Sequence, residues 1–180
     1  MRLKSPSHES TITSKQNRFC GPAAISAITG ISCEQASREI AAHRDRVGYG
    51  CRTFKSADDS QAVRGAYTEE VLAVLKSHGF EGEQVFGPKN WKYDDRQVWS
   101  PAWGEYRDSL RIATPTFKQW WTGRDSATKR SLCLIVIGRH FVVVRGDNVS
   151  DNQQGLRKLA KSKHNRKRIK EVVVISERVA

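Results

Sequence analysis

The chain has 180 residues, of which 38% are hydrophobic and 28% charged, and its formal net charge is +12. This length suits one domain with a buried core. No apolar run approaches the ~20 residues of a membrane helix, so we expect no membrane partner. A charge this positive favours anionic partners and decides nothing about the fold.

The start of the chain predicts a polar tail rather than a targeting signal. Residues 1–15 lack the apolar core of a signal peptide. This favours a cytoplasmic location, or association with a virion if a phage encodes the chain. We expect the tail to cover residues 1–12 and a single domain to cover residues 13–180.

Three helices are predicted in the first half. The first runs from Cys20 to Gly30, because a glycine at its end suits a C-terminal cap. The second follows Ser32, since Gln35 three residues later completes a capping box. The third covers residues 68–77, where apolar residues recur at helical spacing.

The second half is predicted to consist mostly of strands. Residues 80–113 indicate irregular structure with a short strand near 83–86, and residues 116–122 indicate a short helix. Apolar or alternating runs then predict strands over 131–137, 140–145, 149–151 and 171–175. Because helices come first and antiparallel strands last, we predict an α+β fold with N-terminal helices packed against a C-terminal antiparallel sheet.

Cys20 is the first candidate for chemistry. It lies in the segment QNRFCGPAA over residues 16–24, at the start of the first predicted helix. Unpaired backbone N–H groups at such a position stabilise a thiolate, the nucleophilic form of cysteine. Taken alone, the segment fits a buried structural cysteine equally well.

His140 is the second candidate, because it begins the run HFVVV at an end of the predicted sheet. If Gly146 and Asp147 form a two-residue turn, Asp151 lies diagonally across from His140 on the same face of the sheet. If the turn is one residue longer, Asn152 takes that place. Either side chain can orient an imidazole, and Asp147, in the turn itself, ranks third.

A cysteine at a helix start, a histidine at a strand start and an Asp or Asn after a hairpin occur here in that chain order. This pattern resembles the papain-like cysteine peptidase superfamily, and is most similar to its small bacteriocin-processing peptidase domains. The resemblance covers residues 16–30 and 132–152. It implies an active cleft between helices and sheet, and a thiol hydrolase that cleaves a peptide or isopeptide bond through a triad of Cys20, His140 and Asp151.

One departure from that family pattern concerns the oxyanion hole. The family usually places a glutamine six residues before the nucleophile, where this chain has Ser14. Gln16 and Asn17 are the amides that can replace it, beside the backbone N–H of Cys20. Loss of one oxyanion donor costs about 100- to 1000-fold in turnover. A second hypothesis is therefore a weak or inactive papain-like fold that acts as a binding or structural module.

The basic block over residues 157–170 supports that second hypothesis. It holds eight Lys and Arg residues and is predicted to be a loop. It is either a solvated surface or a contact for nucleic acid or an acidic protein, in a virion for example. A peptide or protein substrate is the partner that the first hypothesis implies.

The four cysteines indicate neither a metal site nor a cofactor. They are Cys20, Cys33, Cys51 and Cys133, and no two of them form a C-x-x-C pair. The set Cys33, His43 and Cys51 has no familiar ligand spacing. We therefore expect thiols and no bound cofactor.

Overall fold

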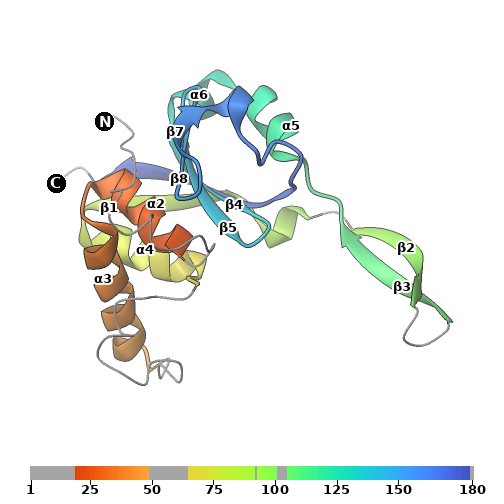
Figure 1. Ribbon diagram of the computed structural model, residues 1–180, viewed down its shortest axis with the longest axis horizontal. Coiled ribbons are helices and arrows are strands. Elements are labelled where there is room, and N and C mark those ends of the chain that lie inside the picture. Colours follow the sequence, from red (N-terminus) through yellow and green to blue (C-terminus); the bar gives the residue numbers. More distant parts are fainter. Residues whose placement is uncertain (1–18, 49–64, 92, 101–104, 179–180) are drawn as a thin grey trace.

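The computed structural model of the chain describes residues 19–48, 65–91, 93–100 and 105–178. Within 93–100 and 105–112 it describes the backbone alone. Three helices lie together beside a six-stranded sheet, and a two-stranded ribbon extends away from this body (Figure 1). The predicted boundary between tail and domain at residues 12–13 lies outside the described residues.

The helical layer consists of α2 (Cys20–Thr29), α3 (Cys33–Arg46) and α4 (Thr68–Ser77). Gly30 ends α2 with a φ of 87°, a left-handed conformation that glycine adopts without strain. Ser32 caps α3, because its Oγ accepts a hydrogen bond of 3.0 Å from the backbone N–H of Gln35. The predicted helix starts are confirmed. No helix among the described residues is long and apolar enough to cross a bilayer.

The sheet is antiparallel throughout, in the order β1-β8-β4-β5-β6-β7. Its strands are β1 (Phe80–Phe86), β4 (Leu132–Ile137), β5 (His140–Arg145), β6 (Asn148–Asp151), β7 (Gly155–Lys158) and β8 (Ile169–Glu177). Since all but β1 come from the second half of the chain, the predicted α+β fold, with N-terminal helices against a C-terminal antiparallel sheet, is confirmed.

Two of the predicted segments differ from the structure. Residues predicted as irregular form the ribbon of β2 (Tyr93–Ser100) and β3 (Glu105–Ile112). The basic loop predicted over 157–170 instead begins within β7 and ends within β8, with a 3-10 turn, η4 (Leu159–Lys161), between them. The other short helical elements among the described residues are η3 (Pro88–Asn90), α5 (Phe117–Thr122) and α6 (Ser126–Arg130).

The central strands of the sheet are buried on both faces. On one face, Leu134 and Val173 pack with Ile25 of α2 and Val71 of α4. The other face has a second cluster that includes Ile135, Val142 and Val172, covered by Phe117 of α5 and Leu159 of η4. Strands covered on both sides carry continuous apolar runs, which explains the unbroken LCLIVI of β4.

The β5–β6 hairpin has the predicted register. Arg145 pairs with Asn148, so the turn has two residues, and the ladder continues only as far as Val143 opposite Ser150. The turn is anchored because the guanidinium of Arg124 donates a 3.0 Å hydrogen bond to the Gly146 carbonyl. Beyond the last pair, the side chains of His140 and Asp151 bridge the two strands.

Candidate active site

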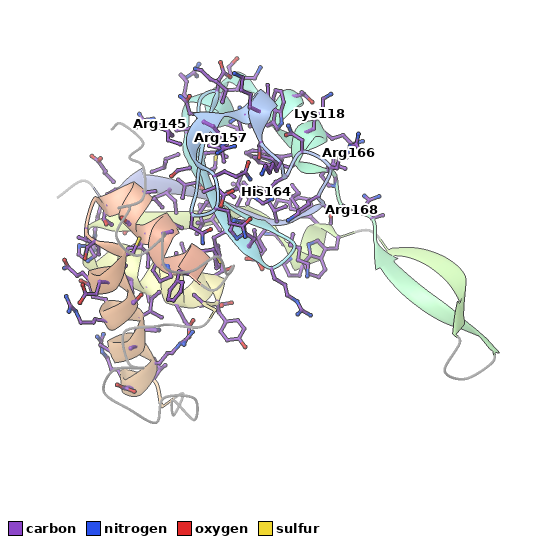
Figure 2. The ribbon with its side chains drawn as sticks, viewed as in Figure 1. Lys118, Arg145, Arg157, His164, Arg166 and Arg168 are labelled. Carbon is purple, nitrogen blue, oxygen red and sulfur yellow. The ribbon has the colours of Figure 1, made fainter. Side chains whose placement is uncertain are left out.

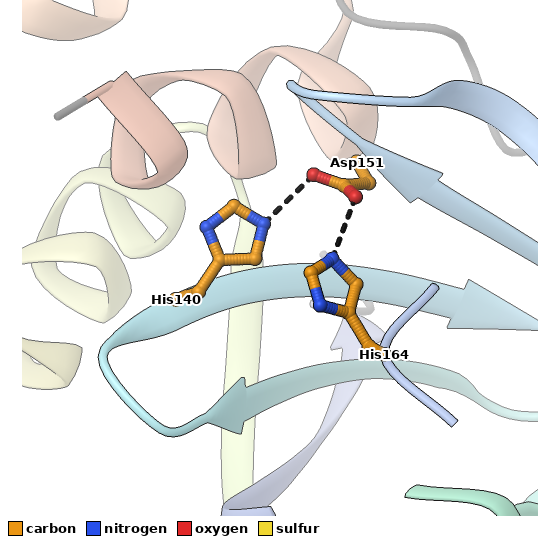
Figure 3. Close-up of side chains that lie close together, drawn as sticks. All are labelled: His140, Asp151 and His164. Atoms are coloured by element: carbon orange, nitrogen blue, oxygen red, sulfur yellow. Dashed lines mark hydrogen bonds and ion pairs between the residues drawn. The ribbon is translucent and has the colours of Figure 1, made fainter. Parts of the chain in front are cut away.

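His140 and Asp151 form a buried pair at the open end of the β5–β6 hairpin (Figure 3). The Nε2 atom of His140 lies 2.7 Å from Oδ1 of Asp151. Each residue is 2% exposed. Two-residue turn geometry puts both side chains on one face of the hairpin, diagonally opposite each other. The ring of His140 is therefore oriented by a short hydrogen bond that water does not reach.

The carboxylate of Asp151 accepts four hydrogen bonds. Oδ1 also accepts from the backbone N–H of Gln153 at 3.0 Å. Oδ2 accepts from the side-chain amide of Gln154 at 2.8 Å and faces Nε2 of His164 at 2.8 Å. Both oxygens are thus fully engaged, as a buried carboxylate requires.

His164 is a residue of this site that the sequence pattern did not indicate. It is 2% exposed and lies between η4 and β8, on the segment that covers the second face of the sheet. Its ring centroid lies 5.0 Å from that of His140. The one sequence signal was a histidine among lysines and arginines, which suggested a solvated block rather than a buried contact.

The hydrogen bonds shift the pKa values of both members of the central pair. Burial lowers the pKa of His140, but the hydrogen bond to Asp151, the contact with the nearby Cys20 and the charge of both groups outweigh it, so the pKa rises to about 9. Burial raises the pKa of Asp151, but its hydrogen bonds with His140 and His164 hold it well below the usual range. At neutral pH the pair is therefore an imidazolium beside a carboxylate.

Cys20 approaches this pair from the helical layer. It is the first residue of α2, is 3% exposed, and belongs to the same buried cluster as Phe141 and Val143 of β5. Helix α2 packs against both β5 and β6. The structure therefore brings Cys20, His140 and Asp151 to one place from three elements.

The second ring nitrogen of His140 is the one available to the thiol. Nε2 is committed to Asp151, whereas Nδ1 is buried and among the described residues nothing hydrogen-bonds to it. Cys20 is near enough to raise the pKa of His140. The contact does not meet hydrogen-bond geometry, as is often the case for catalytic groups before a substrate binds.

Two of the other candidate residues, Asn152 and Asp147, are described by the structure and do not hydrogen-bond to this group. Asn152 is half-buried, and its Oδ1 has no hydrogen-bond partner among the described residues. Asp147 is exposed in the hairpin turn. Gln16 and Asn17, the candidate oxyanion donors, lie outside the described residues, as does Cys51 of the metal set that we considered.

A metal ion fits this cluster poorly. His140, Asp151 and His164 offer donor atoms within 4.8 Å of one another. However, both oxygens of the carboxylate already accept two hydrogen bonds each. A cation would have to displace N–H donors from a buried carboxylate, which is costly. The chemistry of the cluster is that of a hydrogen-bonded proton network.

Comparison with known proteins gives one structural likeness. No protein-family model matches the sequence, and no curated protein is similar to it. The fold is similar to the crystal structure of a double glycine motif protease from an AMS/PCAT transporter in complex with the leader peptide. That chain is 14% identical, the match covers 98% of this chain and 94% of that chain, and the TM-score is 0.45. At this identity and TM-score, the likeness assigns neither an activity nor a substrate to the chain.

Proposed function

We propose that this chain is a thiol hydrolase of the papain-like type that cleaves a peptide or isopeptide bond. The observation that carries the proposal is the buried His140–Asp151 pair, together with the interaction between Cys20 and the His140 ring. A nucleophile, a base and a group that orients the base make up the set that acyl transfer needs.

In the first half of the reaction, Cys20 acts as the nucleophile. Its sulfur attacks the carbonyl carbon, and the electron pair of the C=O bond moves to the oxygen. We assign the stabilisation of that oxyanion to the backbone N–H of Cys20 at the start of α2, with the amide of Gln16 or Asn17 as the second donor. The imidazolium of His140 then donates its proton to the leaving nitrogen, which leaves as an amine, and a thioester on Cys20 remains.

In the second half, His140 reverses its role. The now neutral ring takes a proton from water while the water oxygen attacks the thioester carbon. The acid product leaves, and the proton gained by His140 restores the ion pair with the sulfur. Asp151 stays ionised throughout, because its task is to hold the ring and stabilise its positive charge.

The test is selective alkylation with iodoacetamide near neutral pH. Cys20, Cys33 and Cys133 are 3%, 2% and 0% exposed, so differences in burial between them are small. Burial raises the pKa of Cys133 to about 11, so this thiol stays protonated and unreactive. We expect Cys20 to react at least about tenfold faster than the other two, because thiolate is the reactive form.

The rate at Cys20 in a His140 variant and in the wild type decides whether the thiol is activated. Replacing His140 by Asn should bring the rate at Cys20 down to that of Cys33, as measured by peptide mass spectrometry. A wild-type rate at Cys20 no higher than the rate at Cys33 would mean that the thiol is not activated and that the proposal is wrong.

A second candidate function is a binding module for an anionic partner such as nucleic acid. Exposed cations cluster on the segment before β8, including Lys163, Arg166 and Arg168. Lys118 of α5 lies beside them, since its backbone N–H donates a 3.1 Å hydrogen bond to the Asn165 carbonyl. Figure 2 shows Lys118, Arg166 and Arg168 on the same side of the molecule.

This candidate is tested by binding to duplex DNA across a range of salt concentrations. Affinity should fall steeply with salt, and reversing Lys163 and Arg166 to Glu should weaken it about tenfold or more. The matched control reverses Lys76 of α4 and Arg46 of α3 to Glu, two exposed cations in the other layer, so that both variants change the net charge equally. Equal losses in the two variants would show a general charge effect and no binding surface.

A further inference from the structure

We infer that His164 is a positioning residue for the proposed Cys20–His140 pair, because it holds the second oxygen of the carboxylate that orients the His140 ring. This inference rests on the proposed hydrolase function and adds a fourth residue to the set. Nε2 of His164 lies 2.8 Å from Oδ2 of Asp151, and Nε2 of His140 lies 2.7 Å from Oδ1.

The physical reason is the rotation of the carboxylate. A carboxylate held at one oxygen can still turn about its Cβ–Cγ bond, because that torsion is broad. Two imidazoles on opposite oxygens, with the side-chain amide of Gln154 beside His164 on Oδ2, restrict this freedom. Their rings are tilted by 37° to each other, and each contacts a different oxygen. Orientation of this kind is what a base needs to stay in a productive geometry.

The ring of His164 is placed by its own segment and does not depend on Asp151 alone. The backbone N–H of His164 donates to Ser162 Oγ at 3.2 Å. The neighbouring N–H of Lys163 donates to Gln154 Oε1 at 3.0 Å, and Leu159 is buried at 1% exposure. The segment is thus fastened to both the second cluster and the turn after Asp151. It delivers a pre-oriented N–H donor to the carboxylate.

Other titratable groups around the carboxylate come from each element that packs against it. They are His140 of β5, Cys20 of α2, which acts on the ring of His140, and Arg157 of β7, whose guanidinium donates to the backbone carbonyl of Gln154. Arg157 acts on the turn rather than on the carboxylate itself. The two histidines are therefore the titratable groups that contact the Asp151 carboxylate directly, beside the backbone N–H of Gln153 and the side-chain amide of Gln154.

The alternative is that His164 is only a core histidine that satisfies a buried carboxylate. Both roles predict some loss of stability on replacement. They differ in what happens to Cys20, since a purely structural residue would leave the pH profile of its reaction unchanged. They also differ in whether His164→Gln keeps the reactivity of Cys20, because Gln can place an amide N–H where the ring has Nε2–H.

The experiment measures the alkylation rate of Cys20 by iodoacetamide between pH 5 and 10 in the full chain. His164→Leu removes the donor and keeps the volume, and should slow the reaction at pH 7 about tenfold and shift its profile by about one pH unit. His164→Gln should remain within about threefold of the wild type. His78→Leu is the matched control, because His78 pairs with Glu39 at 2.6 Å on the other side of the molecule, and should change nothing.

The inference is overturned if His164→Leu keeps the wild-type rate and profile, or if His164→Gln falls as far as the leucine variant. Failure of the proposed function is a separate result, in which wild-type Cys20 reacts no faster than Cys33. If His164→Leu does not fold, ring ¹⁵N–¹H spectra replace it. The wild type should show two downfield Nε2–H signals and His164→Gln one, whereas a single signal in the wild type would contradict the inference.

Discussion

The geometry of one imidazole governs the proposed chemistry. Nε2 of His140 is bonded to Asp151, which leaves Nδ1 for proton transfer to and from the sulfur. An amide in place of the carboxylate cannot serve both histidines. Asn offers one acceptor oxygen, and its NH₂ group would face an N–H donor.

Asp151→Asn should therefore lose one of the two imidazole hydrogen bonds and the charge that stabilises the imidazolium. We expect hydrolysis, or alkylation of Cys20 in its place, to slow by a factor on the order of 100 or more. Stopped-flow or mass-spectrometric rates at pH 7 would measure this. Asn152→Ala serves as the control, since the structure gives Asn152 no bond to His140, and it should react at the wild-type rate.

Helix α2 positions the nucleophile through close contact with the segment before α4. A Cβ added at Gly21 would lie 2.6 Å from Cβ of Ala66, so the helix start would have to shift. Gly21→Ala should cost about 1–3 kcal/mol in unfolding free energy and slow the alkylation of Cys20, both measurable on the purified variant. Gly87→Ala is the control, because its new methyl would meet only the flexible side chain of Gln84. Equal stability of the two variants would contradict this account of α2.

The elements that the sequence predicted are those with a strong local signal. The cap at Ser32, the glycine at the end of α2 and the two-residue hairpin turn each depend on a few neighbouring residues, and each is found. The ribbon of β2 and β3 was missed because its strands mix charged and aromatic residues without clean alternation. The four-residue β7, Gly155–Lys158, is too short and too polar to stand out from the basic block.

In the candidate site, too, only the residue with a local sequence signal could be placed. Asp151 could be placed relative to His140 because one tight turn sets the register of the hairpin. His164 could not be placed, because its contact with Asp151 depends on the path of an irregular segment over the second cluster. Such a path follows from burial of Leu159 and from tertiary hydrogen bonds, which leave no periodic pattern in the sequence.

At the scale of the whole molecule, the site joins layers that meet at one end of the sheet. Cys20 comes from the helices, His140 and Asp151 from the sheet, and His164 from the covering segment. The interactions that favour the protonated ring of His140 should therefore also stabilise the fold. Its pKa of about 9 in the folded chain lies above the ordinary value of about 6.5 in the unfolded chain.

The contribution of His140 to stability should be fully present below about pH 6.5 and be lost as the pH rises through about 9. Urea unfolding at a series of pH values would show this as a fall in unfolding free energy over that range. His140→Asn should flatten the fall. A wild-type curve that is flat from pH 6.5 to 9, or one as steep in the variant, would show that the imidazolium is not held by its neighbours.

The most direct measurement is the titration of the His140 ring by ¹⁵N NMR, in the wild type and in Cys20→Ala. Asp151 and Cys20 both raise the pKa of this ring, to about 9. The account predicts a midpoint near pH 9 in the wild type and a clearly lower one once the sulfur is removed. An identical midpoint in both proteins would mean that the thiol and the imidazole do not share a site, and would contradict the proposed hydrolase.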